Sequence, residues 1–162
     1  MTPAIPERMV QRFEITELFD RYAAALDNDR LEEWPGFFVE DCLYEIIPKE
    51  NEDAGLPAPV IHCDSAGMLR DRVLSLRHAN IYEKPTYRHF TSGIEWTAVD
   101  PDTLDVTSSY IVVNTSQAGS TSIYQAGVSK DRLVRTPDGW RFKAKRVVYD
   151  TLRVQTLLAI PI

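Results

Sequence analysis

Three histidines, His62, His78 and His89, are the side chains best suited to acid–base catalysis or metal binding. His89 precedes Phe90 in a strand-like stretch, and strand alternation directs the two side chains to opposite faces. If one face of the sheet lines a cavity, His89 could meet Asp27 near the end of the first helix. A buried carboxylate beside an imidazole can abstract a proton or promote a dehydration. The alternative is a histidine that bonds to a backbone carbonyl or lies at an interface.

The same histidines lack the spacing of metal ligands. A Rieske iron–sulfur cluster needs Cys-x-His and Cys-x-x-His pairs, whereas here only His62 and Cys63 are adjacent. A mononuclear iron site needs two histidines and a carboxylate, and no His-x-x-x-His or similar pair places two of them on one face. We therefore expect this chain to bind no metal.

Composition and charge narrow the possible partners. The chain has 162 residues and a formal net charge of −6, whereas nucleic acids and acidic membranes attract basic surfaces. No apolar stretch approaches the ~20 residues that span a bilayer. Residues 1–8 contain no export signal, so the two cysteines are typical of reduced thiols in the cytoplasm. We expect one domain covering residues 1–162.

A long first helix must position Asp27. Residues 1–8 should be flexible, and a helix is predicted from about residue 9 to residue 26. Its apolar side chains recur at the spacing of one helical face: Ile15, Leu18, Phe19, Tyr22 and Leu26.

Two shorter helices are predicted next. One should open with a capping box of Asp29 and Glu32, be limited by Pro35 and bury Trp34. A strand follows at residues 42–47, and the polar, proline-containing residues 48–59 should form a loop. The other helix should begin at Asp64 or Ser65 as N-cap.

The second half of the chain has the alternation of β-strands. Phe90, Ser92, Ile94 and Trp96 are spaced for one face of a strand that starts near Thr86. Further strands are predicted at about 103–117, 121–135 and 140–154. The stretch 136–139, Thr-Pro-Asp-Gly, should form the turn between the last two.

Helices followed by long strands predict an α+β fold. The expected architecture is a cystatin-like, nuclear-transport-factor-like cone, in which a bent antiparallel sheet wraps around the long N-terminal helix. The two shorter helices would close its mouth.

Two further features could form contacts with a partner. Arg141, Lys143 and Lys145 are spaced to form a basic row on one strand face, which either receives an acidic partner or is simply solvated. Residues 155–162 form an apolar tail without a helical pattern of its own, which needs a groove or a neighbouring subunit to bury it.

Several stretches, taken in order, resemble the small (beta) subunits of aromatic-ring-hydroxylating dioxygenases. The likeness is nearest to the small subunits of terephthalate, salicylate and anthranilate oxygenases, and it covers nearly the whole chain. The stretches that carry it are Glu33-Trp34-Pro35 with Phe37-Phe38, Asp41-Cys42 with Tyr44, Asn80-Ile81-Tyr82-Glu83, Tyr87-Arg88-His89, and Thr156-Leu157-Leu158-Ala159-Ile160-Pro161.

The resemblance implies a structural, non-catalytic subunit of a multicomponent oxygenase that acts on a terephthalate-like aromatic acid. In that family the large (alpha) subunit carries the Rieske 2Fe-2S cluster and the mononuclear Fe(II). The small subunit forms a trimer that stabilises a trimer of large subunits, and this chain would need no cofactor or catalytic residue.

Two alternatives from other classes remain open. The chain could be a free-standing cone-fold dehydratase, isomerase or polyketide-cyclase-like enzyme that uses Asp27 and His89, or a module that binds a ligand in an apolar cone. The scaffold interpretation requires a partner chain with the Rieske motif, whereas the other two do not.

Overall fold

A computed structural model describes residues 5–78, 84–150 and 159–162. The helices are α1 (Glu7–Asp27), the 3-10 helix η1 (Leu31–Phe37), α2 (Lys49–Asp53) and α3 (Ala66–His78). The strands are β1 (Phe38–Pro48), β2 (Ile61–Cys63), β3 (Thr86–Asp100), β4 (Thr103–Thr115), β5 (Thr121–Thr136) and β6 (Gly139–Tyr149). Three features named from the sequence lie wholly or partly outside the described residues: the resemblance stretch at 80–83, the end of the strand predicted at about 140–154, and the first half of the apolar tail at 155–162.

The strands form one bent sheet with the order β2-β1-β6-β5-β4-β3. β1 pairs with β6 in parallel, and the other neighbours are antiparallel. The prediction of a wholly antiparallel sheet was therefore wrong for this one pair. β1 and β6 are far apart in the sequence, so no hairpin turn forces them to run in opposite directions.

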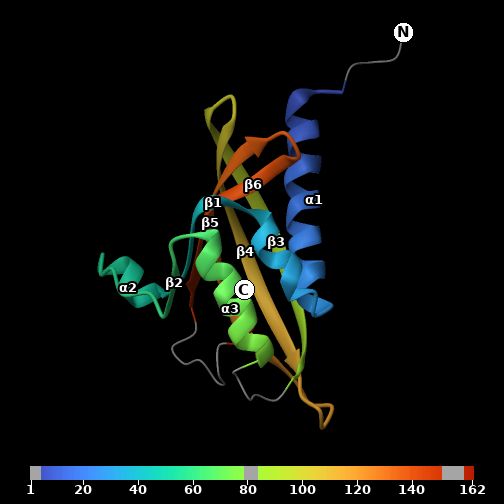
Figure 1. Ribbon diagram of the computed structural model, residues 1–162. Coiled ribbons are helices and arrows are strands. Elements are labelled where there is room, and N and C mark those ends of the chain that lie inside the picture. Colours follow the sequence, from blue (N-terminus) through green and yellow to red (C-terminus); the bar gives the residue numbers. More distant parts are fainter. Residues whose placement is uncertain (1–4, 79–83, 151–158) are drawn as a thin grey trace.

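The long helix α1 packs against β3 and β6, while α3 packs against β1 and η1 (Figure 1). The predicted apolar stripe of α1 is buried, and Ala25 joins it. The arrangement confirms the α+β cone. Its core is rich in aromatic rings that meet edge to face or tilted: Phe19, Tyr22, Trp34, Phe38, Tyr44 and Phe142.

The helices differ from the prediction in three ways. α1 begins at Glu7, inside the stretch expected to be flexible, and α2 lies within the expected loop 48–59. The capping box of Asp29 and Glu32 does not form. Asp29 has a φ of 57°, and both carboxylates accept hydrogen bonds from Arg77 instead. Ser65 does cap α3, because its Oγ accepts a hydrogen bond from the Met68 amide at 3.3 Å.

A bulge in β3 changes which side chains face inward. The pairing of β3 with β4 is irregular between Ser92 and Glu95, where Gly93 has a φ of 61°. Ile94 and Trp96 are buried as predicted, but Phe90 is 55% exposed. An extra residue reverses the alternation, so Phe90 points out of the core and His89 points toward it.

A second bulge, in β6, breaks the predicted basic row. Arg132 pairs with Ala144 and Leu133 with Phe142, which leaves Lys143 as the extra residue. Lys145 consequently lies on the same side as Phe142 and is buried. The row was wrongly predicted, and only Arg141 and Lys143 remain at the surface, where they form ion pairs with Asp138 and Asp41 respectively.

Candidate functional site

Asp27 and His89 meet inside the cone, a contact that the sequence analysis considered for the strand face opposite Phe90. Asp27 is the last residue of α1 and His89 lies near the start of β3. The His89 Nδ1 lies 2.6 Å from Asp27 Oδ1, and the two side chains are 8% and 13% exposed respectively. The backbone N–H of His89 also donates to both carboxylate oxygens, at 3.2 and 3.0 Å. The pair has the geometry of a general acid–base unit.

The second nitrogen of His89 contacts the chain's own C-terminal segment, residues 159–162. Nε2 lies 3.1 Å from the carbonyl oxygen of Pro161. The nitrogen that a free acid–base pair would present to a substrate is therefore already bonded. His89 therefore makes both contacts that the sequence analysis considered. It pairs with Asp27 and it also bonds to a backbone carbonyl.

Side chains from three other elements bind the same segment. Arg72 of α3 donates to the Ala159 carbonyl at 3.2 Å. The hydroxyl of Tyr22 donates to the Ile162 carbonyl at 2.8 Å, and the Ile162 amide donates to the hydroxyl of Tyr44 at 3.0 Å. Burial raises the pKa of both tyrosines above the usual value, so they remain protonated. All four residues of the segment are buried.

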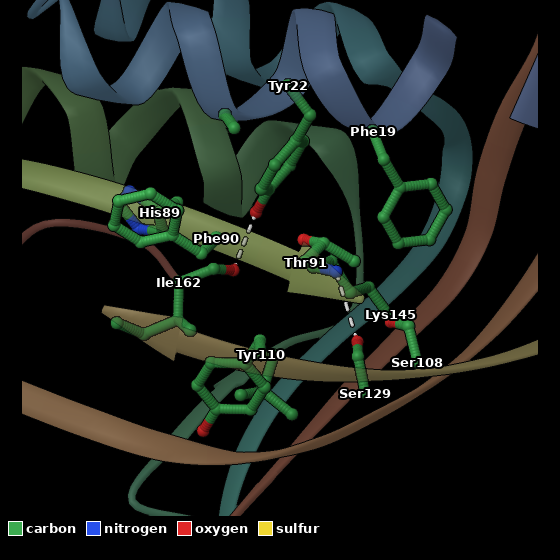
Figure 2. A pocket seen from close by; sticks show the side chains of 12 residues that line it. Phe19, Tyr22, His89, Phe90, Thr91, Ser108, Tyr110, Ser129, Lys145 and Ile162 are labelled. Atoms are coloured by element: carbon green, nitrogen blue, oxygen red, sulfur yellow. Dashed lines mark hydrogen bonds between the residues drawn. The ribbon is translucent and has the colours of Figure 1, made fainter. Parts of the chain in front are cut away.

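A small cavity of about 20 Å³ remains between α1 and the sheet, beside Ile162 (Figure 2). That is room for roughly one water molecule. Its polar lining includes Ser108, whose buried Oγ has no hydrogen-bond partner among the residues that the structure describes, together with Ser129 and Lys145.

Lys145 belongs to a buried charged cluster that the sequence did not reveal. Its Nζ lies 3.0 Å from Ser129 Oγ and 3.4 Å from Asp131 Oδ2, and Ser129 donates to Asp131 Oδ1 at 2.7 Å. Burial raises the pKa of the Asp131 carboxyl, and the Lys145 ammonium opposes that shift. The ammonium also lies over the rings of Phe19, Tyr22 and Phe142. Alternation alone places Lys145 on the same strand face as Arg141 and Lys143. The bulge at Lys143 moves it to the inward face.

The other candidate ligands lie apart. His62 in β2 pairs with Glu45 at 2.9 Å on the surface, and His78 is an exposed residue at the end of α3. Cys42 and Cys63 are buried free thiols, and burial raises the pKa of each. Within the described residues, no three His, Cys, Asp or Glu side chains are grouped to hold a metal ion. These donor sets do not fit a Rieske cluster or a mononuclear iron site.

No helix in the described part of the chain is long and apolar enough to cross a membrane.

The fold places this chain in a class of cone-shaped α+β proteins. A solved cystatin-like-fold protein from Nostoc punctiforme shares this fold, with a TM-score of 0.66 and 17% identity over 88% of this chain and 93% of that one. Within the class, the family model described as ring hydroxylating beta subunit matches residues 21–156. The chain belongs to this family, and it is a small subunit of an aromatic-ring-hydroxylating dioxygenase.

Named members of the family are similar to this chain over nearly its whole length. It is 59% identical to the anthranilate 1,2-dioxygenase small subunit of Burkholderia cepacia, over 98% of each chain. It is 31% identical to the terephthalate 1,2-dioxygenase terminal oxygenase component subunit beta 2 of Comamonas sp, over 95% of this chain and 100% of the relative. A Novosphingobium aromaticivorans structure, assigned as the beta subunit of an aromatic-ring-hydroxylating dioxygenase, has a TM-score of 0.89 and 44% identity, over 97% of this chain and 100% of that one.

Proposed function

We propose that this chain is a non-catalytic subunit that holds the catalytic large subunits of its dioxygenase together. The contact between His89 Nε2 and the Pro161 carbonyl carries the proposal. A dehydratase or isomerase that used Asp27 and His89 would need an open nitrogen facing its substrate, and here the chain's own backbone occupies that position. The same contact argues against the free-standing enzyme and the open ligand-binding cone.

The partners and cofactors follow from family membership. We propose an assembly of three large and three small subunits, with the Rieske 2Fe-2S cluster and the mononuclear Fe(II) in the large subunits. We also place the chain in the cytoplasm, where the buried thiols of Cys42 and Cys63 would stay reduced.

We propose an aromatic carboxylic acid as the substrate of the assembled enzyme. The relative named for anthranilate is 59% identical to this chain, whereas the one named for terephthalate is 31% identical. This difference favours an anthranilate-like acid over a terephthalate-like one.

The test is turnover per assembled complex, measured after co-expression with a large subunit that carries the Rieske motif. Oxygen uptake with anthranilate or terephthalate would be compared between the wild type and the double variant Asp27→Asn/His89→Gln. A matched control is Glu45→Gln/His62→Gln, which alters a carboxylate–histidine pair at 2.9 Å on the surface. Light scattering coupled to size exclusion would report the stoichiometry of each complex.

For a scaffold, turnover per correctly assembled complex should change less than about tenfold in both double variants, and any lost activity should follow lost assembly. General acid–base catalysis contributes about a hundredfold to ten-thousandfold in rate. A loss of that size in Asp27→Asn/His89→Gln, with normal assembly, would contradict the proposal. An 18.5 kDa species alone, with or without the large subunit, would contradict the stoichiometry.

A further inference from the structure

We propose that the interior of the cone is a peptide-binding site and that its ligand is the chain's own C-terminal segment, Ala159–Ile162. The segment belongs to no helix or strand, so side chains of the cone hold it in place. This inference concerns the small subunit alone and is independent of the oxygenase's substrate.

The first argument is that the cone recognises the main chain of the segment. Arg72, His89 and Tyr22 come from three different elements and each contacts a different carbonyl oxygen. Tyr44, from a fourth element, accepts from the Ile162 amide. Convergent hydrogen bonds to backbone groups are a characteristic of sites that bind an extended peptide.

The second argument is that these groups are oriented by contacts outside the segment. Trp34 Nε1 donates to the Tyr22 hydroxyl at 3.0 Å, so this oxygen has its own proton free to donate to Ile162. Asp27 holds the His89 ring at Nδ1 and also accepts from the His89 backbone. A site whose donors are already oriented loses less conformational entropy when its ligand binds.

The third argument is that the His89 ring holds both partners at once. The Pro161 carbonyl can only accept, so Nε2 must donate to it. On the other side of the ring, Nδ1 lies 2.6 Å from Asp27 Oδ1, and the backbone N–H of His89 donates to the same carboxyl group. Other charged or titratable groups near this ring are Arg88, which reaches the Asp27 carbonyl at 3.4 Å, and Lys145, Tyr22 and Tyr110, which line the same cavity.

The side chains of the segment complete the fit. Ile162 lines the small cavity together with Phe19, Tyr110 and Val147, and Ile160 lines a second pocket together with Leu26 and Tyr87. Pro161 lacks a backbone N–H, so it brings no donor that would need a partner in this buried setting. The ligand class is therefore a short apolar peptide whose carbonyls face the donors of the cone.

The first experiment uses the full chain and measures hydrogen exchange of the Ile162 amide by NMR. His89→Phe keeps a ring of similar size but removes both ring nitrogens, and it should lower the protection of this amide by at least about tenfold, as expected for the loss of a buried hydrogen bond. His62→Phe is the matched control and should leave the protection unchanged.

Unchanged protection in His89→Phe would overturn the inference. A second experiment separates the segment from its site. A chain ending at residue 158 should bind the synthetic peptide acetyl-Ala-Ile-Pro-Ile with one-to-one stoichiometry in calorimetry, and adding His89→Phe should weaken that binding at least about tenfold. The inference would also be overturned if the truncated chain folded but did not bind the peptide, or if the full chain bound the peptide as tightly as the truncated chain.

Discussion

The ammonium nitrogen of Lys145 lies 3.4 Å from Oδ2 of Asp131, and the two side chains are 6% and 0% exposed respectively. Both charges are thus removed from water, and each depends on the other for compensation. Ser129 hydrogen-bonds to both partners. A buried pair of this kind adds little net stability, but it makes the loss of either partner costly.

Lys145→Met should lower the free energy of unfolding by about 3–5 kcal/mol, because Asp131 would remain as an uncompensated buried charge. Lys145→Met/Asp131→Leu should recover most of that loss. Urea denaturation measures both effects, with the surface substitution Lys143→Met as the control. A double variant as unstable as the single one would show that the lysine matters for packing and not for charge.

The same single variant should respond to pH. Burial raises the pKa of Asp131 above its ordinary value of 3.8, and Lys145→Met removes the charge that opposes this shift. A carboxyl whose pKa is higher in the folded state favours folding when protonated. The stability of Lys145→Met should therefore increase, relative to the wild type, as the pH falls toward 3.8. A constant difference between the two proteins across that range would contradict this assignment.

Trp34→Ala should destabilise the fold. Trp34 is fully buried, packs edge-on against Phe38 and Tyr44 and donates to Tyr22. Losing a buried tryptophan costs about 3–5 kcal/mol. Leu74→Ala, at an exposed site on α3, should change stability by less than about 0.5 kcal/mol. Thermal unfolding of the two variants provides the comparison, and an unchanged melting temperature for Trp34→Ala would refute the packing argument.

Gly127→Ala should disrupt the contact between β5 and β6. A Cβ at Gly127 would lie 2.0 Å from the carbonyl oxygen of Val148 and 2.8 Å from the Cα of Tyr149. Both are backbone atoms, so the strands would have to separate, at a cost of about 1–3 kcal/mol or more. Gly36→Ala is the control, because nothing lies within 4 Å of its added Cβ. Equal urea midpoints for the two variants would be inconsistent with this close approach.

Arg77→Gln should weaken the fold more at neutral pH than in acid. Arg77 binds Glu32 at 2.7 Å and Asp29 at 2.8 Å, and its hydrogen bond lowers the pKa of Glu32 from 4.5 to about 2. A lowered carboxyl pKa contributes stability above 4.5 that is lost as the pH falls through 2. Exposed pairs contribute about 0.2–1 kcal/mol each. The gap between the urea midpoints of variant and wild type should narrow as the pH falls toward 2, leaving the part that comes from the Arg77 hydrogen bond to the Asp29 carbonyl at 2.7 Å. A gap of constant size would contradict the role of the carboxylates.

Local patterns in the sequence were enough to predict much of the fold. The apolar stripe of α1, the Ser65 cap of α3 and the turn before Gly139 all depend on neighbours within a few residues, so their signals are complete in the sequence. Alternation also placed His89 on the strand face opposite Phe90, but the bulge at Gly93 decided that this face points inward, toward Asp27. The family likeness identified the class of protein for the same reason, since it rests on the order of short stretches.

The tertiary structure decided what local patterns could not. The bulges at Gly93 and Lys143 each add one residue to a strand, and they reverse the faces that Phe90 and Lys145 occupy. The parallel pairing of β1 with β6 depends on a long connection whose direction no turn fixes. The sequence predicted that the apolar tail would be buried in a groove or against a neighbouring subunit. Residues 159–162, the part of the tail that the structure describes, lie inside the chain's own cone. Side chains from four separate elements hold this segment, and only folding brings those elements together.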